Sequence, residues 1–576
     1  MRLRLKNACI KSALCVSLNR RKLLQTLRKG VEPLKKVFLL LLLVLSLFMC
    51  AGALGEEGRT VVLKLSEETQ QNGNKAYKKD SRTYDRDMTV PVIDGVEAFK
   101  GPQLSDGISY IIPLAQDATE AVLHLPYSAA FTTIEINGEL LNHDAPVTVP
   151  LGEEILVRVA TKNRRAIFYM HLTTLPVAVI DYKGSDLYAN NVNGTMTLYD
   201  TNYVANGQKE MAYTTAITIG YRGQSSLSYD KHNYSVHLKD ESGEQNKASL
   251  LGLRKDDDWV LSGAMNDQLR VRNMVAMQVW DEYYTLPWTD VSGAIEGEYC
   301  EVIMNGKYLG LYCLMEKLDR KQADLDKTDG RIVRSVEAEK SGVNIMSFTE
   351  MGGNKPANRS TWYNMEIKFP KEEDVKKSDW DEFYDFIYFV NKSKDDKFAA
   401  EIGNYIDIDN FAAYYVYITA IGATGNMNKN LYFVMDDAAA EDAKWYVVPW
   451  DVDGSFGRRN NASKRDIEVL SSNQLFERLI KTNAQGFVDI MREKWNEHKD
   501  GLFSYESLMA RFAAYYTMLD EQGVWTREKA KWPTFSKSYK FDAEKEWQYI
   551  QDYMKERWDF VDSYFNGDNL SAKKWM

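Results

Sequence analysis

The chain is poor in the residues on which many enzymes depend. It contains only six His and five Cys among 576 residues, and three of the cysteines lie at or before residue 50. The histidines form no HExxH pattern, no serine occupies a GxSxG turn, and no CxxC pair, Walker loop or GxGxxG sequence occurs. These absences argue against a zinc enzyme, a common serine hydrolase and a P-loop or Rossmann nucleotide site.

Long apolar runs are also scarce. The one clear run, residues 37–49 (VFLLLLLVLSLFM), follows a basic stretch and is too short to span a bilayer comfortably. It suits the core of a signal peptide, because small residues follow it at 51–53. The sequence therefore predicts a leader over residues 1–53, a secreted or cell-surface protein, and no transmembrane anchor beyond the signal segment. Cys50 offers a lipoprotein alternative, although Met49 before it is larger than that pathway usually accepts.

Positive charge is concentrated at the start of the chain. The formal charge is −10 overall and +10 over residues 1–53, which leaves −20 for the remainder. A body this acidic repels nucleic acid, so we expect no nucleic-acid partner. Hydrophobic residues make up 44% of the chain, enough for a large core and a smaller domain.

The texture of the sequence predicts an α+β protein with a helical C-terminal part behind a small all-β, sandwich-like domain. Residues 54–90 are polar and are expected to form a mobile linker, with room for one strand. Residues 91–174 alternate apolar and polar positions between frequent turns, which is typical of a β-sandwich. Residues 175–565 mix strands and helices, with a charged insertion at 320–405, and are mostly helical beyond residue 465.

Two cysteines remain in the body of the chain. Cys300 and Cys313 flank a hairpin whose turn is marked by Asn305-Gly306. A loop centred on residues 306–307 would place the two cysteines opposite each other, where a disulfide could form in an oxidising compartment. The alternative is a pair of small buried hydrophobic residues.

Five short segments occur in an order that resembles the CotH kinases, a family named for a spore-coat protein kinase. The resemblance extends over residues 175–560 and implies a kinase-like fold, ATP and Mg²⁺ (or Mn²⁺) as cofactors, and phosphorylation of Ser or Thr on coat or envelope proteins. The segments are Tyr221-Arg222-Gly223-Gln224-Ser225-Ser226 with Lys231, Leu251-Gly252-Leu253 with Arg272-Asn273, Val302–Lys317, Asn430-Leu431-Tyr432-Phe433, and Trp450-Asp451-Val452-Asp453-Gly454.

Within this resemblance the first and third segments would bind the nucleotide. The turn that contains Gly223, Ser225 and Ser226 would let backbone N–H groups approach phosphate oxygens. Lys231 on the next strand would contact the same phosphates, or is an ordinary lysine at a strand edge. Glu316 would orient that lysine, as an acidic partner does in kinases, or is a surface acid of the hairpin.

The second, fourth and fifth segments supply the other candidates. Arg272 and Asn273 would reach the nucleotide or brace their helix. Asp451 and Asp453 follow a buried strand and share one face, so both carboxylates can converge on a cation, with Asn430 as a third oxygen ligand. The alternatives for the two acids are a plain Asp-Gly turn and an incomplete calcium loop.

The sequence departs from the family pattern at the expected proton acceptor. The family has an Asp a few residues before the position of Asn430, whereas no Asp or Glu occurs between residues 411 and 435 here. Asn426 or Asn428 stands in that place, and an amide cannot accept the proton. An acid of the insertion at 320–405, for example Asp324, Asp326 or Asp329, is a candidate to replace it.

Two functions therefore remain open, with a third resting on composition alone. The first is an exported kinase of weakened activity. The second is a catalytically inactive pseudokinase that serves as a binding or structural module at the cell surface. The third, a polysaccharide-binding protein, rests on the abundance of Tyr and Trp.

Overall fold

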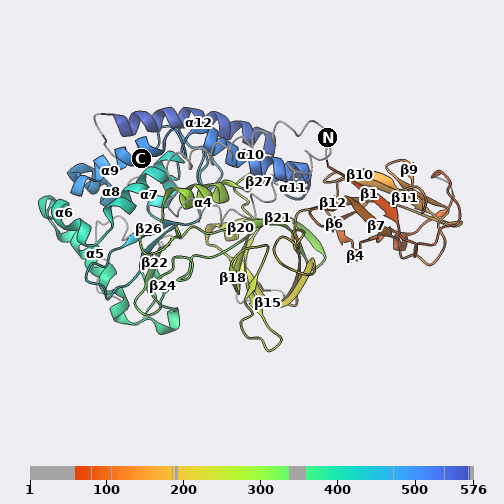
Figure 1. Cartoon of the computed structure of the whole chain (residues 1–576), viewed down its shortest axis with the longest axis horizontal. Coiled ribbons are helices and arrows are strands. Elements are labelled where there is room, and N and C mark those ends of the chain that lie inside the picture. The colour runs from red at the N-terminus through yellow and green to blue at the C-terminus, as the bar shows by residue number, and fades with distance from the viewer. Residues whose placement is uncertain are drawn as a thin grey trace. The chain divides into compact units, whose positions relative to one another are not determined.

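The described residues cover most of the chain and divide into two compact units (Figure 1). The computed structural model describes residues 59–567 and 570, apart from 79–80, 105–106, 185, 189–191, 337–358, 471–472 and 537–538. The predicted leader and Cys50 lie outside this range. Unit 1 consists of the described parts of Met1–Ala98, Leu114–Thr174 and Thr201–Met211, and unit 2 of those of Phe99–Pro113, Leu175–Asp200 and Ala212–Met576. In the described part of the chain, no helix is both long and apolar enough to cross a membrane.

Unit 1 is built from short strands in which buried and exposed positions alternate. In β1 (Thr60–Leu65), Val61, Leu63 and Leu65 are buried and the residues between them are not. β1 pairs with two neighbours, so part of the segment expected to be a linker is an integral strand. One sheet has the order β10 (Val147–Pro150), β1, β7 (Glu120–His124), β3 (Val92–Ile93), β4 (Val96–Glu97). The other strands are β12 (Arg164–Thr173), β11 (Ile155–Ala160), β8 (Thr133–Ile136) and β9 (Glu139–Leu140), with β2 (Thr83–Tyr84) beside β12.

Unit 2 begins with a closed barrel. A parallel pairing between β13 and β20, with Val177 opposite Glu301, closes it. Its interior is apolar and includes Ile219, Val236 and Trp259, all fully buried. The strand order is β13 (Val177–Tyr182), β14 (Val192–Tyr199), β15 (Ala212–Arg222), β16 (Asn233–Lys239), β19 (Asp258–Ser262), β21 (Lys307–Met315), β20 (Gly297–Met304). Small hairpins are formed by β5 (Phe99–Lys100) with β6 (Ile108–Pro113) and by β17 (Ala248–Ser249) with β18 (Lys255–Asp256).

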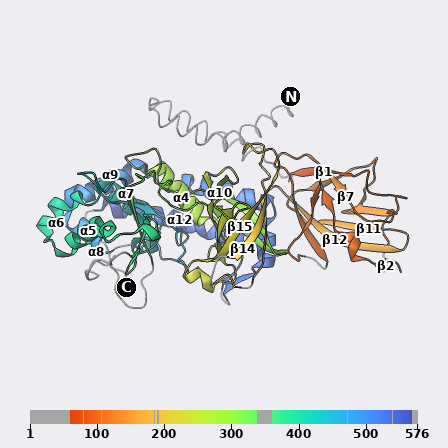
Figure 2. The same ribbon diagram turned by 90° about the horizontal axis from the view of Figure 1, so that it is seen from below.

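An antiparallel sheet and the helices complete unit 2. Its strands, in order, are β23 (Thr361–Trp362), β24 (Met365–Phe369), β22 (Arg331–Ser335), β25 (Leu431–Met435) and β26 (Tyr446–Pro449). Figures 1 and 2 show α5 to α9 gathered around this sheet. The helices are α4 (Arg272–Tyr283), α5 (Asp381–Lys392), α6 (Asp395–Glu401), α7 (Ile408–Ala420), α8 (Gln474–Thr482), α9 (Phe487–His498), α10 (Tyr505–Glu521), α11 (Val524–Lys531) and α12 (Ala543–Asn566). The α+β class and the helical C-terminal part are therefore confirmed.

Buried ion pairs join the C-terminal helices to the barrel and to α4. Arg527 of α11 donates two hydrogen bonds to Glu301 of β20, at 2.8 and 2.9 Å. Glu546 of α12 pairs with Arg272 of α4 and with Arg458. These acids and bases are almost completely buried, so each needs its partner in place.

The register of the hairpin settles the two cysteines. The turn is the two-residue Asn305-Gly306, with Met304 opposite Lys307, and not a loop centred on residues 306–307. A bulge between Val302 and Ile303 then shifts the pairing by one residue, so that Cys300 lies opposite Tyr312 and Cys313 lies opposite Tyr299. Because neighbouring positions of a strand face opposite sides of the sheet, Cys300 and Cys313 lie on opposite sides. Both are free thiols, and each is buried in a different apolar cluster. The disulfide interpretation is wrong, and the alternative of two buried hydrophobic residues is confirmed.

Candidate functional site

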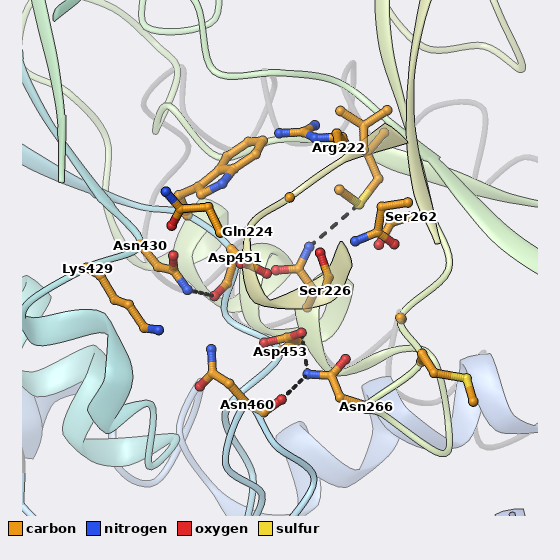
Figure 3. Close-up of a pocket in the computed structure, with 18 of the residues that line it drawn as sticks. Arg222, Gln224, Ser226, Ser262, Asn266, Lys429, Asn430, Asp451, Asp453 and Asn460 are labelled. Atoms are coloured by element: carbon orange, nitrogen blue, oxygen red, sulfur yellow. Dashed lines mark hydrogen bonds between the residues drawn. The ribbon is translucent and has the colours of Figure 1, made fainter. Parts of the chain in front are cut away.

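A pocket of about 360 Å³ lies in unit 2 between one rim of the barrel and one edge of the antiparallel sheet (Figure 3). Its volume is within the usual range for small-molecule sites. The polar and charged residues that line it are Arg222, Gln224, Ser226, Tyr229, Asn233, Ser235, Ser262, Asn266, Asn273, Arg334, Ser335, Lys429, Asn430, Asp451, Asp453 and Asn460.

The barrel contributes a turn that depends on glycine. β15 ends at Arg222, which pairs with Asn233 at the start of β16, and the chain reverses between them. Gly223 in this turn has a φ of +107°, and a Cβ there would lie 2.0 Å from the hydroxyl oxygen of Ser226. Only glycine tolerates both the conformation and the close approach. The turn places Ser226 in the pocket as predicted, whereas the side chain of Ser225 lies outside the described residues.

Strand register brings the fourth and fifth segments together. Leu431 at the start of β25 pairs with Ser335 at the end of β22 and with Pro449 at the end of β26. Asn430 and Asp451 therefore leave the same edge of the sheet. Both have left-handed backbone conformations, with φ of 59° and 51°, which Asn and Asp adopt more readily than most residues. The Asn430 amide also donates to the Asp451 carbonyl oxygen at 3.2 Å.

Asp453 presents a carboxylate oxygen that no group in the described part of the chain satisfies. Its Oδ2 accepts a hydrogen bond from Asn266 Nδ2 at 2.7 Å, while its Oδ1 is buried and has no hydrogen-bond partner there. The loop is held from behind by Asn273, whose Oδ1 accepts from the Val452 N–H at 2.8 Å. A buried, unpaired carboxylate oxygen is costly unless a cation or donor occupies the pocket.

The two aspartates also oppose each other's ionisation. Desolvation raises the pKa of Asp451, although Arg222, Lys429 and Arg334 act in the opposite direction. Burial, followed by the charge of Asp451, raises the pKa of Asp453 well above its usual range. A divalent cation between the two carboxylates would remove this repulsion.

The available ligands suit Mg²⁺, which usually keeps water or phosphate in its shell, better than a metal held by protein ligands alone. No group of three or more His, Cys, Asp or Glu gathers within the described ranges. A cation here would therefore be held by Asp451 and Asp453, with the amide oxygen of Asn430 or Asn460 and with water or phosphate completing its shell. Mg²⁺ is commonly bound in this way, through one or two carboxylates and the phosphates of a substrate. The residues thus fit the predicted metal.

Basic side chains surround the acids, and sequence reasoning missed them. Arg222 lies over the Trp450 ring, 5.8 Å from its centroid, and its buried Nη1 has no hydrogen-bond partner among the described residues. Arg334 and Lys429 also line the pocket, although Arg334 is paired with Glu366 at 2.5 Å. Arg222 directly precedes Gly223, so its place beside the turn was the available signal. Together the cations make the pocket suitable for phosphate oxygens.

Lys231 and Glu316 lie elsewhere. Lys231 is buried and does not line the pocket; its ammonium donates to Glu528 at 2.9 Å and to the Leu311 carbonyl at 2.6 Å. Burial lowers its pKa to about 7, against the opposing effect of Glu528. Glu316 accepts instead from the backbone N–H groups of Arg254 and Glu296. The predicted pair is not formed, because α11 supplies the acidic partner of the lysine.

Arg272 braces the fold, as one of its two interpretations held. It is fully buried, pairs with Asp267 and Glu546, and donates to the Ser455 carbonyl at 3.1 Å. It does not line the pocket, whereas its neighbour Asn273 does. A cofactor-binding role for Arg272 is therefore not supported.

Neither asparagine at the place of the family acid faces the pocket. Asn426 is fully buried, and its amide nitrogen donates to the carbonyl oxygens of Asn430 and Trp450 at 2.9 and 2.8 Å. It holds together the two segments that leave the sheet. Asn428 is exposed and lines a neighbouring groove instead. Both are therefore misplaced as catalytic residues of this pocket.

The arrangement as a whole places two carboxylates among cations beside a glycine turn, which are the groups from which phosphate and metal sites are commonly built. The chain belongs to the CotH kinase protein family, which matches residues 219–561. That segment contains every residue that lines the pocket in the described part of the chain. No relative was found among curated proteins.

Proposed function

We propose that this protein is an exported, kinase-like phosphotransferase of low activity, which transfers the γ-phosphoryl group of ATP to Ser or Thr of coat or envelope proteins. The unsatisfied Oδ1 of Asp453, beside Asp451 and within reach of basic side chains, is the observation that carries the proposal. Membership of the CotH kinase family supports a kinase-like function for the pocket. The family also favours a kinase-like fold, in which the barrel and the sheet with its helices would be the two lobes.

The lining residues suggest a division of labour. Asp453 and Asp451, with Asn430, would hold Mg²⁺ or Mn²⁺, which when bound would neutralise charge on the phosphates. Arg222 and the backbone N–H groups of the Gly223 turn would bind phosphate oxygens. In the reaction the substrate hydroxyl oxygen bonds to the γ-phosphorus, the bond to the bridging oxygen breaks, ADP leaves, and the hydroxyl proton must be accepted.

The site has no separate acceptor for that proton among its described lining residues. Asp451 and Asp453 are the carboxylates among the described lining residues. Asp324, Asp326 and Asp329 do not replace the missing acid, because they precede Arg331, at the end of β22 remote from the pocket. Without a dedicated base we expect transfer to be slower by about 10²–10⁴-fold than in a complete site.

Nucleotide binding tests the proposal directly. We expect the purified protein to bind ATP in a Mg²⁺- or Mn²⁺-dependent manner, and Asp453→Asn to weaken that binding about tenfold or more. Asp489→Asn is the matched control, since the Asp489 side chain on α9 is 72% exposed and has only surface partners in the described structure, Asn483 at 3.1 Å and Arg492 at 4.0 Å. Wild-type protein that binds no nucleotide, or equal affinity in Asp453→Asn, would refute the assignment.

A pseudokinase is the second candidate, favoured by the missing proton acceptor. Labelled ATP distinguishes the two: incorporation into the protein or a general substrate, lost in Asp453→Asn, indicates a kinase. Metal-dependent binding with no incorporation indicates a pseudokinase that acts as a binding or structural module at the cell surface. Export is tested separately, by locating a tagged full-length chain in the medium, the envelope or the cell interior.

A further inference from the structure

A second groove of about 410 Å³ adjoins the pocket. Its lining residues are Thr424, Gly425, Asn428, Lys429, Arg459, Asn460, Asn461 and Arg465. Lys429 and Asn460 line both cavities, so the groove opens beside the two aspartates of the pocket. In Figure 3, Lys429 and Asn460 both lie on the same side of Asp451 and Asp453.

The groove carries positive charge in an otherwise acidic body. Three of its described lining residues, Lys429, Arg459 and Arg465, are cations, and none of those described is an acid. Arg459 pairs with Asp466 at 3.9 Å, and the Asp466 side chain is 83% exposed. Such an ion pair is weak and screened by solvent.

The groove is also preformed. Arg458 and Lys464 make an isolated antiparallel bridge, and the Arg459 N–H donates to the Ser463 carbonyl at 2.9 Å. Arg465 is buried and donates to the Thr424 hydroxyl and, at 3.3 Å, to the Arg458 carbonyl. A rigid cluster of like charges pays little ordering entropy when it binds an anion.

The cations of the groove also act on one another. Burial lowers the pKa of Arg465 to about 10, Tyr553 opposes that change, and the charges of Arg459 and Arg557 lower it further. An anion placed among these side chains would relieve the repulsion.

We propose that this groove binds the segment of a protein substrate next to the phosphoacceptor hydroxyl, and that it selects acidic side chains there. The proposal rests on the phosphotransferase function above and adds the class of its substrate. A segment bound across Lys429 and Asn460 has its neighbouring residue at the mouth of the pocket that contains the aspartates. Carboxylates of Asp or Glu, or phosphate groups already present on the substrate, would contact Arg459 and Arg465.

A peptide-binding measurement tests the groove without requiring transfer. The probe is a fluorescein-labelled peptide with a central Ser between runs of Glu, compared by anisotropy with the same peptide carrying Gln. We expect the Glu peptide to bind about tenfold tighter or more, and Arg459→Glu to abolish the difference. Lys397→Glu is the control, because it makes the same charge change at a 60% exposed lysine of α6 that lines neither cavity. Arg459→Gln serves as a second variant that adds no negative charge beside Asp466.

Each outcome bears on the groove or on the pocket. Loss of the Glu preference in both Arg459 variants, with Mg²⁺–ATP binding unchanged, supports the proposal. Equal binding of the two peptides, or an equal effect of Lys397→Glu, overturns it. If Arg459→Gln loses ATP instead, or ATP alone displaces the peptide, the groove belongs to the nucleotide and the proposal fails. If the wild type binds no Mg²⁺–ATP but keeps the Arg459-dependent preference, the phosphotransferase function fails and the groove stands as an acidic-segment site.

Discussion

Replacement of Lys231 tests whether this lysine stabilises the fold or binds the nucleotide. Its side chain and that of Glu528 are both completely buried and 2.9 Å apart. Glu528 also accepts from Arg270 at 3.0 Å and from the Leu311 N–H at 2.6 Å. Lys231→Met therefore leaves Glu528 with a second cation but removes two hydrogen bonds of the ammonium, to Glu528 and to the Leu311 carbonyl, a loss of at least about 1.5–3 kcal/mol in the free energy of unfolding.

Glu528→Gln should be more harmful than Lys231→Met. It leaves Lys231 and Arg270 buried against a neutral amide, and breaking a buried pair in this way costs about 3–5 kcal/mol. The double variant should lose less than the sum of the two single losses, because the lysine charge is then absent.

Denaturant unfolding followed by Trp fluorescence measures these losses in unit 2, which contains both residues. All thirteen Trp lie at or after position 259, so their emission reports on unit 2. Lys545→Met is the control: the Lys545 side chain is 84% exposed and its pair with Asp542 is at the surface, so we expect a change within about 0.5 kcal/mol.

The same variants measure nucleotide affinity. Because Lys231 does not line the pocket, Lys231→Met should keep its Mg²⁺–ATP affinity under conditions where it is folded. If Lys231→Met unfolds like the wild type but no longer binds nucleotide, the structural role is refuted and Lys231 is instead a phosphate-binding residue.

Three further predictions follow from buried groups. Burial raises the pKa of Glu316 to about 7, so its contribution to stability is present below pH 4.5, its ordinary pKa, and is lost as pH rises through about 7. Glu316→Gln should therefore flatten the dependence of the unfolding midpoint on pH between these two values. An unchanged slope would contradict the raised pKa. Cys300 and Cys313 should each be alkylated after denaturation without reductant, as peptide mass mapping would show, whereas a linked peptide would restore the disulfide. Asn426→Asp should lower the free energy of unfolding by about 1–3 kcal/mol and restore no transfer activity, because its carboxylate would face two carbonyl oxygens. Asn428→Asp, at an exposed position, should leave stability nearly unchanged. A gain of transfer activity in Asn426→Asp would instead show that residue 426 lies at the reacting groups.

The C-terminal helices have a role in the site that their own sequence does not suggest. α11 supplies the acid for Lys231 behind the barrel, and α12 supplies Glu546, which holds Arg272 and Arg458. Arg458 begins the loop that carries the basic groove. The helical part therefore positions both cavities through buried ion pairs, although its residues line neither one in the described structure.

Much of the fold and part of the site could be predicted from sequence because local patterns encode them. Period-two and helical spacing predicted the α+β class, and Asn305-Gly306 predicted the hairpin turn. The acids that follow KWYVVPW were expected at the end of a strand, and Asp451 and Asp453 both line the pocket. The ordered segments also predicted the family, because the short motifs that resemble it can be read directly along the chain.

Tertiary packing decided the rest. One bulge moved the cysteines to opposite faces, a change of register that no local pattern marks. Lys231 found its partner in Glu528, 297 residues away, and not in the nearer Glu316. Asn426 became a buried brace because two strand ends meet over it, and Arg222 and Arg459 became site residues because the loops that carry them line cavities. Pairings over such separations depend on the packed core, which sequence spacing alone does not specify.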